Sequence, residues 1–573
     1  MRKTRKSRDS WACAGERTAR WPRGSRDTFP FQEVVHLKRL EMAAAEGDLD
    51  EAQAIVQQRR RSIWRHQAER AVRWKAAERC VDLLVAVAAW TKVAPAPDAC
   101  AKDWILAYTA GDGLWRVDRG QRLVEQGTAA CAEDEEIAGL VGVCRRTYRE
   151  VVEAVQGGFL RAVEREGWPP DAIARQTQVF DRHVAPPLAE GQKMVLFLVD
   201  AMRYEMGRDL AGALEEQGAT SVAAAASVLP PMTPLGMAAL MPGADGAFAL
   251  VDESGALVPA VSGRVLATSA DRMAYVRSRY GDRFADLALG ELLSASQKKL
   301  KGTLEKVDLA IVRTQDMDVL AEAGHLYQAR KYMTEILGEL VDATRRLASL
   351  GFHNFAYAAD HGHVLLHEVP PGDALPSPPG SWKLEKRRCR LGESTAGAAG
   401  TVVLKADRVG IVGSVSDLVV PTGFKVFTAG EGYFHEGISL QECLIPVVTL
   451  AVRTKAVAAG KGESVEIRYR SDRFTSRIVG LKVHFASLLT QKLTIRLEVY
   501  DGPGPKAKVA GEAADCDARD EVTGLITLKK GEEVQVPLQV REDFAGDAIE
   551  VRAIDPTGGV ILHRLRLKNA MLE

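Results

Sequence analysis

The first third of the chain carries apolar residues at the spacing of amphipathic helices. From about residue 31 to 185 they recur every three or four positions, with Arg and Glu on the opposite face. One such stripe consists of Ile137, Leu140, Val141, Cys144, Tyr148, Val151, Val152 and Val155. The pattern predicts a helical domain over residues 31–187, which ends in a linker at 181–187 because Pro186 and Pro187 break a helix.

Residues 190–455 follow a different pattern, in which short apolar runs alternate with helical segments. This alternation predicts an α/β domain with a largely parallel sheet. Three apolar runs, at 194–199, 309–312 and 355–359, have acidic residues at or just beyond their ends. These acids are Asp200, Asp316, Asp318 and Asp360. Because ligands of open α/β sheets bind outside the carboxyl ends of the strands, we expect the acids to converge on one site.

The two ends of the chain differ from both of these regions. Residues 460–573 alternate apolar and polar positions with period two, as at 493–499, which predicts a small β-sandwich. Residues 1–30 are basic and show no apolar period, so we expect a disordered tail. The predicted fold class is an α/β core with a largely parallel sheet, preceded by an α-helical domain and followed by a β-sandwich.

Composition and charge indicate the compartment and the kinds of partner that we expect, and they do not indicate the chemistry. The 573 residues include 76 Lys and Arg against 76 Asp and Glu, so no whole-chain field attracts nucleic acid or an anionic membrane. The eight Cys residues are scattered without a C-x-x-C pair, which signals neither a disulfide framework nor a thiolate zinc site. No apolar run approaches the roughly 20 residues needed to span a bilayer, and the first residues lack a secretory signal, so we expect a cytoplasmic protein.

Candidate chemistry rests on oxygen and imidazole ligands, since the sequence lacks the glycine motifs that bind nucleotides and the G-x-S-x-G elbow. Such ligands suit Zn²⁺ or Mn²⁺ better than Ca²⁺ or an iron–sulfur cluster. Asp360 and His361 end an apolar run before Gly362, where a glycine allows close approach of the backbone. Alone the pair also fits a helix cap followed by a polar loop residue. Together with Asp200 at the end of another apolar run, it favours a metal site.

Five ordered segments between residues 200 and 446 carry a resemblance to a known family. Residues 200–205 read D-A-M-R-Y-E, and they match the strand-ending D-x-M-R-Y-[DE] signature of the PglZ domain of the alkaline phosphatase superfamily. The other segments that resemble this family lie at 231–237, 313–318, 359–362 and 435–442. The resemblance implies an alkaline-phosphatase-like core and a phosphate site with two divalent metal ions, Zn²⁺ or Mn²⁺.

The resemblance also implies roles for individual residues. Six of them would hold the metals, with Asp200, Thr233, Asp360 and His361 at one position and Asp318 and His435 at the other. Thr233 would be the nucleophile that attacks phosphorus, and Arg203 would steady the phosphate oxygens. Each role has a simpler alternative, in which Thr233 is a turn residue beside Pro234, Arg203 pairs with Glu205, and His435 is an ordinary surface histidine.

The second metal position departs from the superfamily pattern. Related phosphatases usually place His four residues after the Asp, whereas this chain has Glu322 at that distance from Asp318 and His325 three residues later. On a helix that begins at Asp318, either side chain would lie near the site, so His325 or Glu322 could complete it, or neither could. His363 also replaces an apolar residue that is common in PglZ sequences. It is expected to be an extra ligand, a general acid or a simple replacement.

These expectations combine into a metal-dependent phosphohydrolase whose leading substrate class is nucleotide or nucleic-acid phosphodiesters. The alternatives are a phosphomonoesterase of the same superfamily and a non-catalytic scaffold that binds metal for stability. The resemblance further implies a place in BREX-type phage defence, with a DNA methyltransferase and ATPase subunits as partners. The basic segment at 382–390 is expected to be a solvated loop or a lid over a phosphorylated or polynucleotide substrate.

Overall fold

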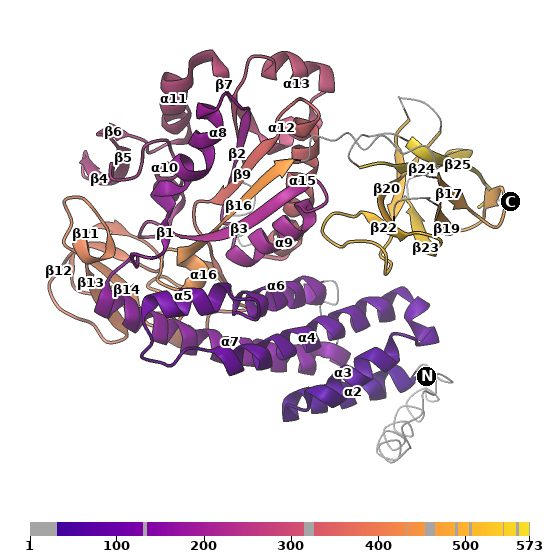
Figure 1. The fold of residues 1–573 in the computed structure, drawn as a ribbon. Helices are drawn as coiled ribbons and strands as arrows, with labels where there is room; N and C mark the ends of the chain where they lie inside the picture. Colours follow the sequence, from indigo (N-terminus) through magenta and orange to yellow (C-terminus); the bar gives the residue numbers. More distant parts are fainter. Residues whose placement is uncertain are drawn as a thin grey trace.

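The computed structural model describes residues 31–129, 135–314, 326–430, 432–452, 464–486, 491–502, 507–541, 544–556 and 561–571. Within these ranges the chain forms a helical region, a mixed α/β domain and a C-terminal β-rich region (Figure 1). The expected basic tail at 1–30 lies outside them, as do Asp316, Asp318, Glu322 and His325.

In the described residues of the helical region there are six α-helices. They are α2 (Phe31–Glu46), α3 (Leu49–Arg59), α4 (Ala68–Val93), α5 (Ala101–Thr109), α6 (Trp115–Ala129) and α7 (Glu135–Glu166). Helix α4 packs against α6 and α7. Every member of the predicted stripe on α7 is buried except Val151, which is half-buried, so the helical prediction is confirmed.

The predicted linker is wrong. Its residues form a π-helical turn (Phe180–Val184) followed by α8 (Ala185–Ala189). Pro186 and Pro187 stand in the first turn of α8, where the missing N–H groups have no partner within the helix anyway. Both prolines therefore begin a helix instead of breaking one.

The central sheet of the α/β domain has seven strands in the order β1-β3-β16-β9-β2-β8-β7. Their bounds are β1 (Ala174–Arg175), β3 (Gly218–Ala226), β16 (Leu444–Val452), β9 (Asn354–Ala359), β2 (Met194–Val199), β8 (Leu309–Arg313) and β7 (Phe284–Ala288). Strands β9, β2, β8 and β7 are mutually parallel, whereas β16 runs antiparallel to both β3 and β9. All residues of β2 are buried, as expected for the middle of a covered parallel sheet. The largely parallel sheet is confirmed.

Three smaller sheets accompany the central one in the described residues, and one of them consists of β4 (Phe248–Glu253), β5 (Ala256–Val261) and β6 (Arg264–Val265). A four-stranded sheet contains β11 (Gly380–Glu385), β12 (Arg390–Ser394), β14 (Asp417–Pro421) and β13 (Thr401–Lys405), and β10 (Val364–Leu365) pairs with β15 (Tyr433–Phe434). The basic segment 382–390, expected to be a solvated loop or a lid, forms parts of β11 and β12 and the turn between them, where Arg388 is fully buried. The Nε of Arg388 lies 2.9 Å from a Glu442 oxygen. The charge of Arg388 is therefore balanced by Glu442 inside the fold.

The C-terminal region consists of strands around its own apolar core. They are β17 (Ser464–Arg468), β18 (Arg473–Phe474), β19 (Ile478–Ala486), β20 (Lys492–Tyr500), β21 (Val509–Ala513), β22 (Ile526–Lys529), β23 (Glu533–Val540), β24 (Ala548–Ile554) and β25 (Ile561–Asn569). Eight of these strands pair in the order β17-β19-β23-β21-β20-β24-β25-β18, and β22 pairs with β20. Strand β17 also contacts β25, where the Ile467 N–H donates to His563 Nδ1. A β-rich region is confirmed, and its strands enclose the core.

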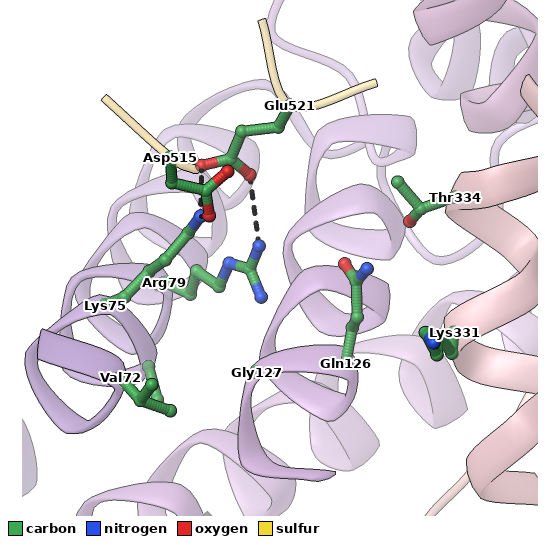
Figure 2. A pocket seen from close by; sticks show the side chains of 10 residues that line it. Val72, Lys75, Arg79, Gln126, Gly127, Lys331, Thr334, Asp515 and Glu521 are labelled. Carbon is green, nitrogen blue, oxygen red and sulfur yellow. Dashed lines mark hydrogen bonds and ion pairs between the residues drawn. The ribbon is translucent and has the colours of Figure 1, made fainter. Parts of the chain in front are cut away.

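Charged side chains join this region to the helical one across a cavity (Figure 2). Lys75 Nζ lies 2.7 Å from Asp515 Oδ2, and Arg79 Nη2 lies 3.1 Å from Glu521 Oε2. Both cations belong to α4, and both acids lie between β21 and β22. Among the helices within the described ranges, none combines the length and apolarity that a membrane span requires.

Candidate metal centre

Two neighbouring parallel strands bring the candidate carboxylates together. Asp200 follows β2 and Asp360 follows β9, and the last residues of these strands, Val199 and Ala359, are paired in register. Asp200, Asp360 and His361 are buried, and one possible ligand atom from each lies within 4.8 Å of the others. The predicted convergence of acids at this edge is confirmed for Asp200 and Asp360.

The Asp360 carboxylate is held on one side only. Its Oδ1 accepts the backbone N–H groups of Ala201 and His361, each at 2.9 Å. No hydrogen bond to its buried Oδ2 is found in the described part of the chain, and the nearby His361 Nε2 lies at 3.4 Å. Ala201 has φ of 51°, a left-handed conformation that residues other than glycine rarely adopt. A buried anionic oxygen in this setting is suited to a cation.

Thr233 reaches the same place from a different element. It begins α10 (Thr233–Ala239), its side chain is half-buried, and its Oγ1 lies 3.1 Å from His361 Nε2. Helix α10 can approach so closely because residue 236 is Gly, since a Cβ there would lie 2.1 Å from the Asp360 carbonyl oxygen. The hydroxyl is thus next to the carboxylate cluster and still partly accessible.

Three histidines at the site share one hydrogen-bonding arrangement. His361, His363 and His435 are buried, and the Nδ1 of each lies close to a backbone carbonyl. The carbonyls belong to Gly362, Ala201 and Pro231, at 2.9, 2.8 and 3.0 Å respectively. A carbonyl can only accept, so Nδ1 carries the proton and Nε2 carries the lone pair in the neutral ring. This is the tautomer that metal-binding imidazoles use.

The three imidazoles lie close together. The rings of His361 and His435 stack with centroids 4.1 Å apart. Burial lowers the pKa of His363 well below its usual range, and the positive charge of Arg203 lowers it further. Both effects favour the neutral form of the His363 imidazole.

Arg203 pairs with Glu205 inside the fold. Its fully buried guanidinium donates from Nε and Nη2 to Glu205 Oε1, at 3.1 and 2.8 Å, and from Nη2 to the Asp118 carbonyl. Arg122 of α6 holds the same Glu205 through both carboxylate oxygens. The structure shows the pairing with Glu205 that was the alternative to a phosphate contact. Its physical reason is that a buried arginine needs a buried anion.

The sequence analysis did not identify a second arginine, Arg272, whose charge acts on the site. Arg272 of α11 (Ser269–Tyr280) is buried, and its Nη1 donates to the carbonyls of Leu266 and Ala267. Burial lowers the pKa of Arg272, and the negative charge of Asp360 opposes that shift. Residue 272 is an ordinary Arg on an amphipathic helix, so only its position in the fold distinguishes it.

Comparisons with known proteins agree with this geometry. Residues 179–450 match the family model of the BREX system PglZ alkaline phosphatase-like domain. Alkaline phosphatase-like protein PglZ of Bacillus cereus (strain H3081.97) is 23% identical to this chain over 354 residues, which is 60% of this chain and 40% of that protein. The chain thus matches less than half of that relative's length. Residues 179–450 of this chain are therefore an alkaline phosphatase-like domain of the BREX PglZ family.

Proposed function

We propose that this chain is a metal-dependent phosphohydrolase of BREX phage defence, in which Asp200, Thr233, Asp360 and His361 hold a divalent cation. The observation that carries the proposal is the buried Asp360 Oδ2, which lacks a hydrogen bond from any described residue and lies 3.4 Å from His361 Nε2. Carboxylate, hydroxyl and imidazole donors fit Zn²⁺ or Mn²⁺. Asp318 and His435, with His325, are proposed to serve a second cation.

Thr233 is the proposed nucleophile. A divalent cation bound here supplies positive charge that favours the ionised hydroxyl and balances the phosphoryl oxygens. Thr233 Oγ1 lies 3.1 Å from His361 Nε2, close enough for one cation to contact both atoms. Oγ1 then attacks phosphorus, the bond from phosphorus to the leaving-group oxygen breaks, and water later hydrolyses the phosphothreonine. Arg272 replaces Arg203 as the candidate contact for phosphate oxygens, because Arg272 lies near Asp360 and Arg203 is paired within the fold.

The proposed substrates are phosphodiesters of nucleotides or nucleic acids, with other BREX subunits, including a DNA methyltransferase and an ATPase, as partners. The substrate class rests on the large regions that flank the site, and the partners rest on the family. A phosphomonoesterase uses the same residues and is the second candidate. A metal-stabilised scaffold is the third, since buried acids and imidazoles can also bind a purely structural cation.

The test combines metal analysis with hydrolysis of a bis-aryl and a mono-aryl phosphate by the full chain. We expect bound Zn²⁺ or Mn²⁺, faster cleavage of the diester, and loss of cleavage in Thr233→Ala. Thr233→Ser is the matched control, because it keeps the hydroxyl and should keep part of the activity. Faster cleavage of the monoester would favour the phosphatase. A folded wild-type chain that holds metal and cleaves neither ester would favour the scaffold.

A further inference from the structure

His363 directly precedes strand β10, and His435 directly follows strand β15, which pairs antiparallel with β10. Strand β10 pairs with β15 through Val364 with Phe434 and Leu365 with Tyr433. Beyond Leu365, the Leu366 N–H donates to the Gly432 carbonyl at 2.7 Å, so the register continues by one residue at that end. Extended by one residue at the other end, the same register sets position 363 against position 435.

The ring contacts agree with this register. Residues directly opposite on antiparallel strands share one face, with Cβ atoms about 4.5–5.5 Å apart, and diagonal neighbours two residues away share that face as well. Tyr433 is the diagonal neighbour of His363, and their ring centroids are 4.8 Å apart. His435 in turn stacks on His361 at 4.1 Å. The register and the ring contact therefore place His363 on the face that carries Tyr433 and His435.

His363 also has the hydrogen-bonding state of a ligand. Its Nδ1 donates to the Ala201 carbonyl at 2.8 Å, one residue after Asp200. Its ring is fully buried, and its Nε2 has no hydrogen-bond partner in the described ranges. A buried lone pair that is left without a partner costs free energy, and a cation would remove that cost.

We propose that His363 binds a divalent cation of the zinc or manganese class through Nε2, on the His435 side of the metal centre. This inference rests on the proposed metal site, and it adds an imidazole that the family signature does not supply. The competing explanation is structural, in which His363 acts only through Nδ1 by holding the Ala201 carbonyl and thus the Asp200 loop.

Two conservative variants separate these roles. Asn at residue 363 keeps an amide donor near the Nδ1 position and loses the ε nitrogen, whereas Gln keeps a polar group near Nε2 and loses the δ donor. A ligand role predicts that His363→Asn and His363→Gln both weaken metal binding. A structural role predicts that only His363→Gln does so. His353→Gln is the control, because His353 is exposed.

The experiment titrates Co²⁺ into the chelator-treated full chain, followed by visible absorption, and measures bound Zn²⁺ after dialysis. We expect His363→Asn to lower the affinity for one Co²⁺ ion by at least about 100-fold. Losing even an outer hydrogen-bond partner of a ligand lowers metal affinity by about 10–100-fold. In the wild type, we expect Zn²⁺ to slow deuterium exchange at the imidazole C2–H of His363, read by tandem mass spectrometry. This second measurement tests the proposal even where a variant does not fold.

The outcomes distinguish this inference from the proposed function. Equal Co²⁺ affinity in wild type and His363→Asn, or unchanged exchange at His363 on adding Zn²⁺, would overturn the role of His363 alone. A wild type that binds no metal would overturn both proposals. Loss of a metal in His363→Asn, in a chain whose wild type holds metal but hydrolyses nothing, would support His363 and refute the hydrolase.

Discussion

Two buried polar clusters lie on either side of the segment 200–205, and they satisfy their charges in different ways. On the helical side, Arg122 and Arg203 both bind Glu205, and all three side chains are fully buried. On the sheet edge, Asp200 and Asp360 meet imidazoles, and the hydrogen bonds to Asp360 come from two backbone amides.

In the helical-side cluster, the carboxylates meet donors from the protein itself. Burial opposes ionisation of Glu205, but Arg122 and Arg203 outweigh it and lower the pKa of that carboxyl. Asp118 extends the cluster by accepting the hydroxyls of Tyr108 and Tyr148, each at 2.9 Å. In the sheet-edge cluster, by contrast, no arginine or tyrosine is seen to donate to Asp360, whose carboxylate meets two backbone N–H groups and the His361 imidazole in the described residues. The difference teaches that burial of charge alone does not mark a metal site, whereas buried acceptors without matching donors do.

The largest expected effect comes from Asp360→Asn. Losing this ligand should lower the rate of phosphate ester hydrolysis by about 10⁴-fold or more, as removal of a catalytic group does in other hydrolases. Steady-state kinetics measures the loss, and circular dichroism checks the fold. A variant that folds and keeps wild-type activity would show that the sheet-edge cluster is not the reaction centre.

The next effect sharpens the comparison from the other side. Arg122→Met leaves Glu205 with one buried partner fewer, and it should lower the free energy of unfolding by about 3–5 kcal/mol. Denaturant titration measures this loss. The control is Arg119→Met, whose side chain is 41% exposed and pairs with Asp209, and which should cost about 1 kcal/mol or less. Equal costs for the two variants would mean that the helical-side cluster contributes no special stability.

Metal should stabilise one cluster and not the other. Zn²⁺ at a hundredfold excess over its Kd should raise the unfolding free energy of the wild type by about 2.7 kcal/mol, because it binds only the folded chain. Arg119→Met should gain the same amount, whereas Asp360→Asn should gain little. Thermal melts with and without Zn²⁺ make the comparison, and an equal gain in Asp360→Asn would place the cation elsewhere.

The smallest effect belongs to the exposed ion pairs between the helical and C-terminal regions. Glu521→Lys removes the contact with Lys75 and Arg79, and it should cost about 0.5–1 kcal/mol, with less effect at high salt. Glu532→Lys is the control, since Glu532 pairs with Lys529 inside the C-terminal region. A cost above about 3 kcal/mol would show that these surface pairs act like the buried cluster.

Much of the fold could be predicted because its patterns are local. The stripe on α7 and the apolar runs of β2, β8 and β9 follow from the spacing of side chains along the chain. The meeting of Asp200 and Asp360 also follows, because parallel neighbouring strands end at the same edge. The helix at Pro186 was missed because a proline reads as a breaker unless the start of the helix is known.

The sequence by itself determined the order of the elements, the acids at the strand ends and the motif spacing that indicates the family. The tertiary structure alone decided which charges face each other. Arg122, which is 83 residues away from Glu205 in the sequence, donates to that carboxylate. Strand register brings His363 close to Tyr433. Such pairings join distant segments, and no local periodicity encodes them, since they arise only when packing sets the register between elements.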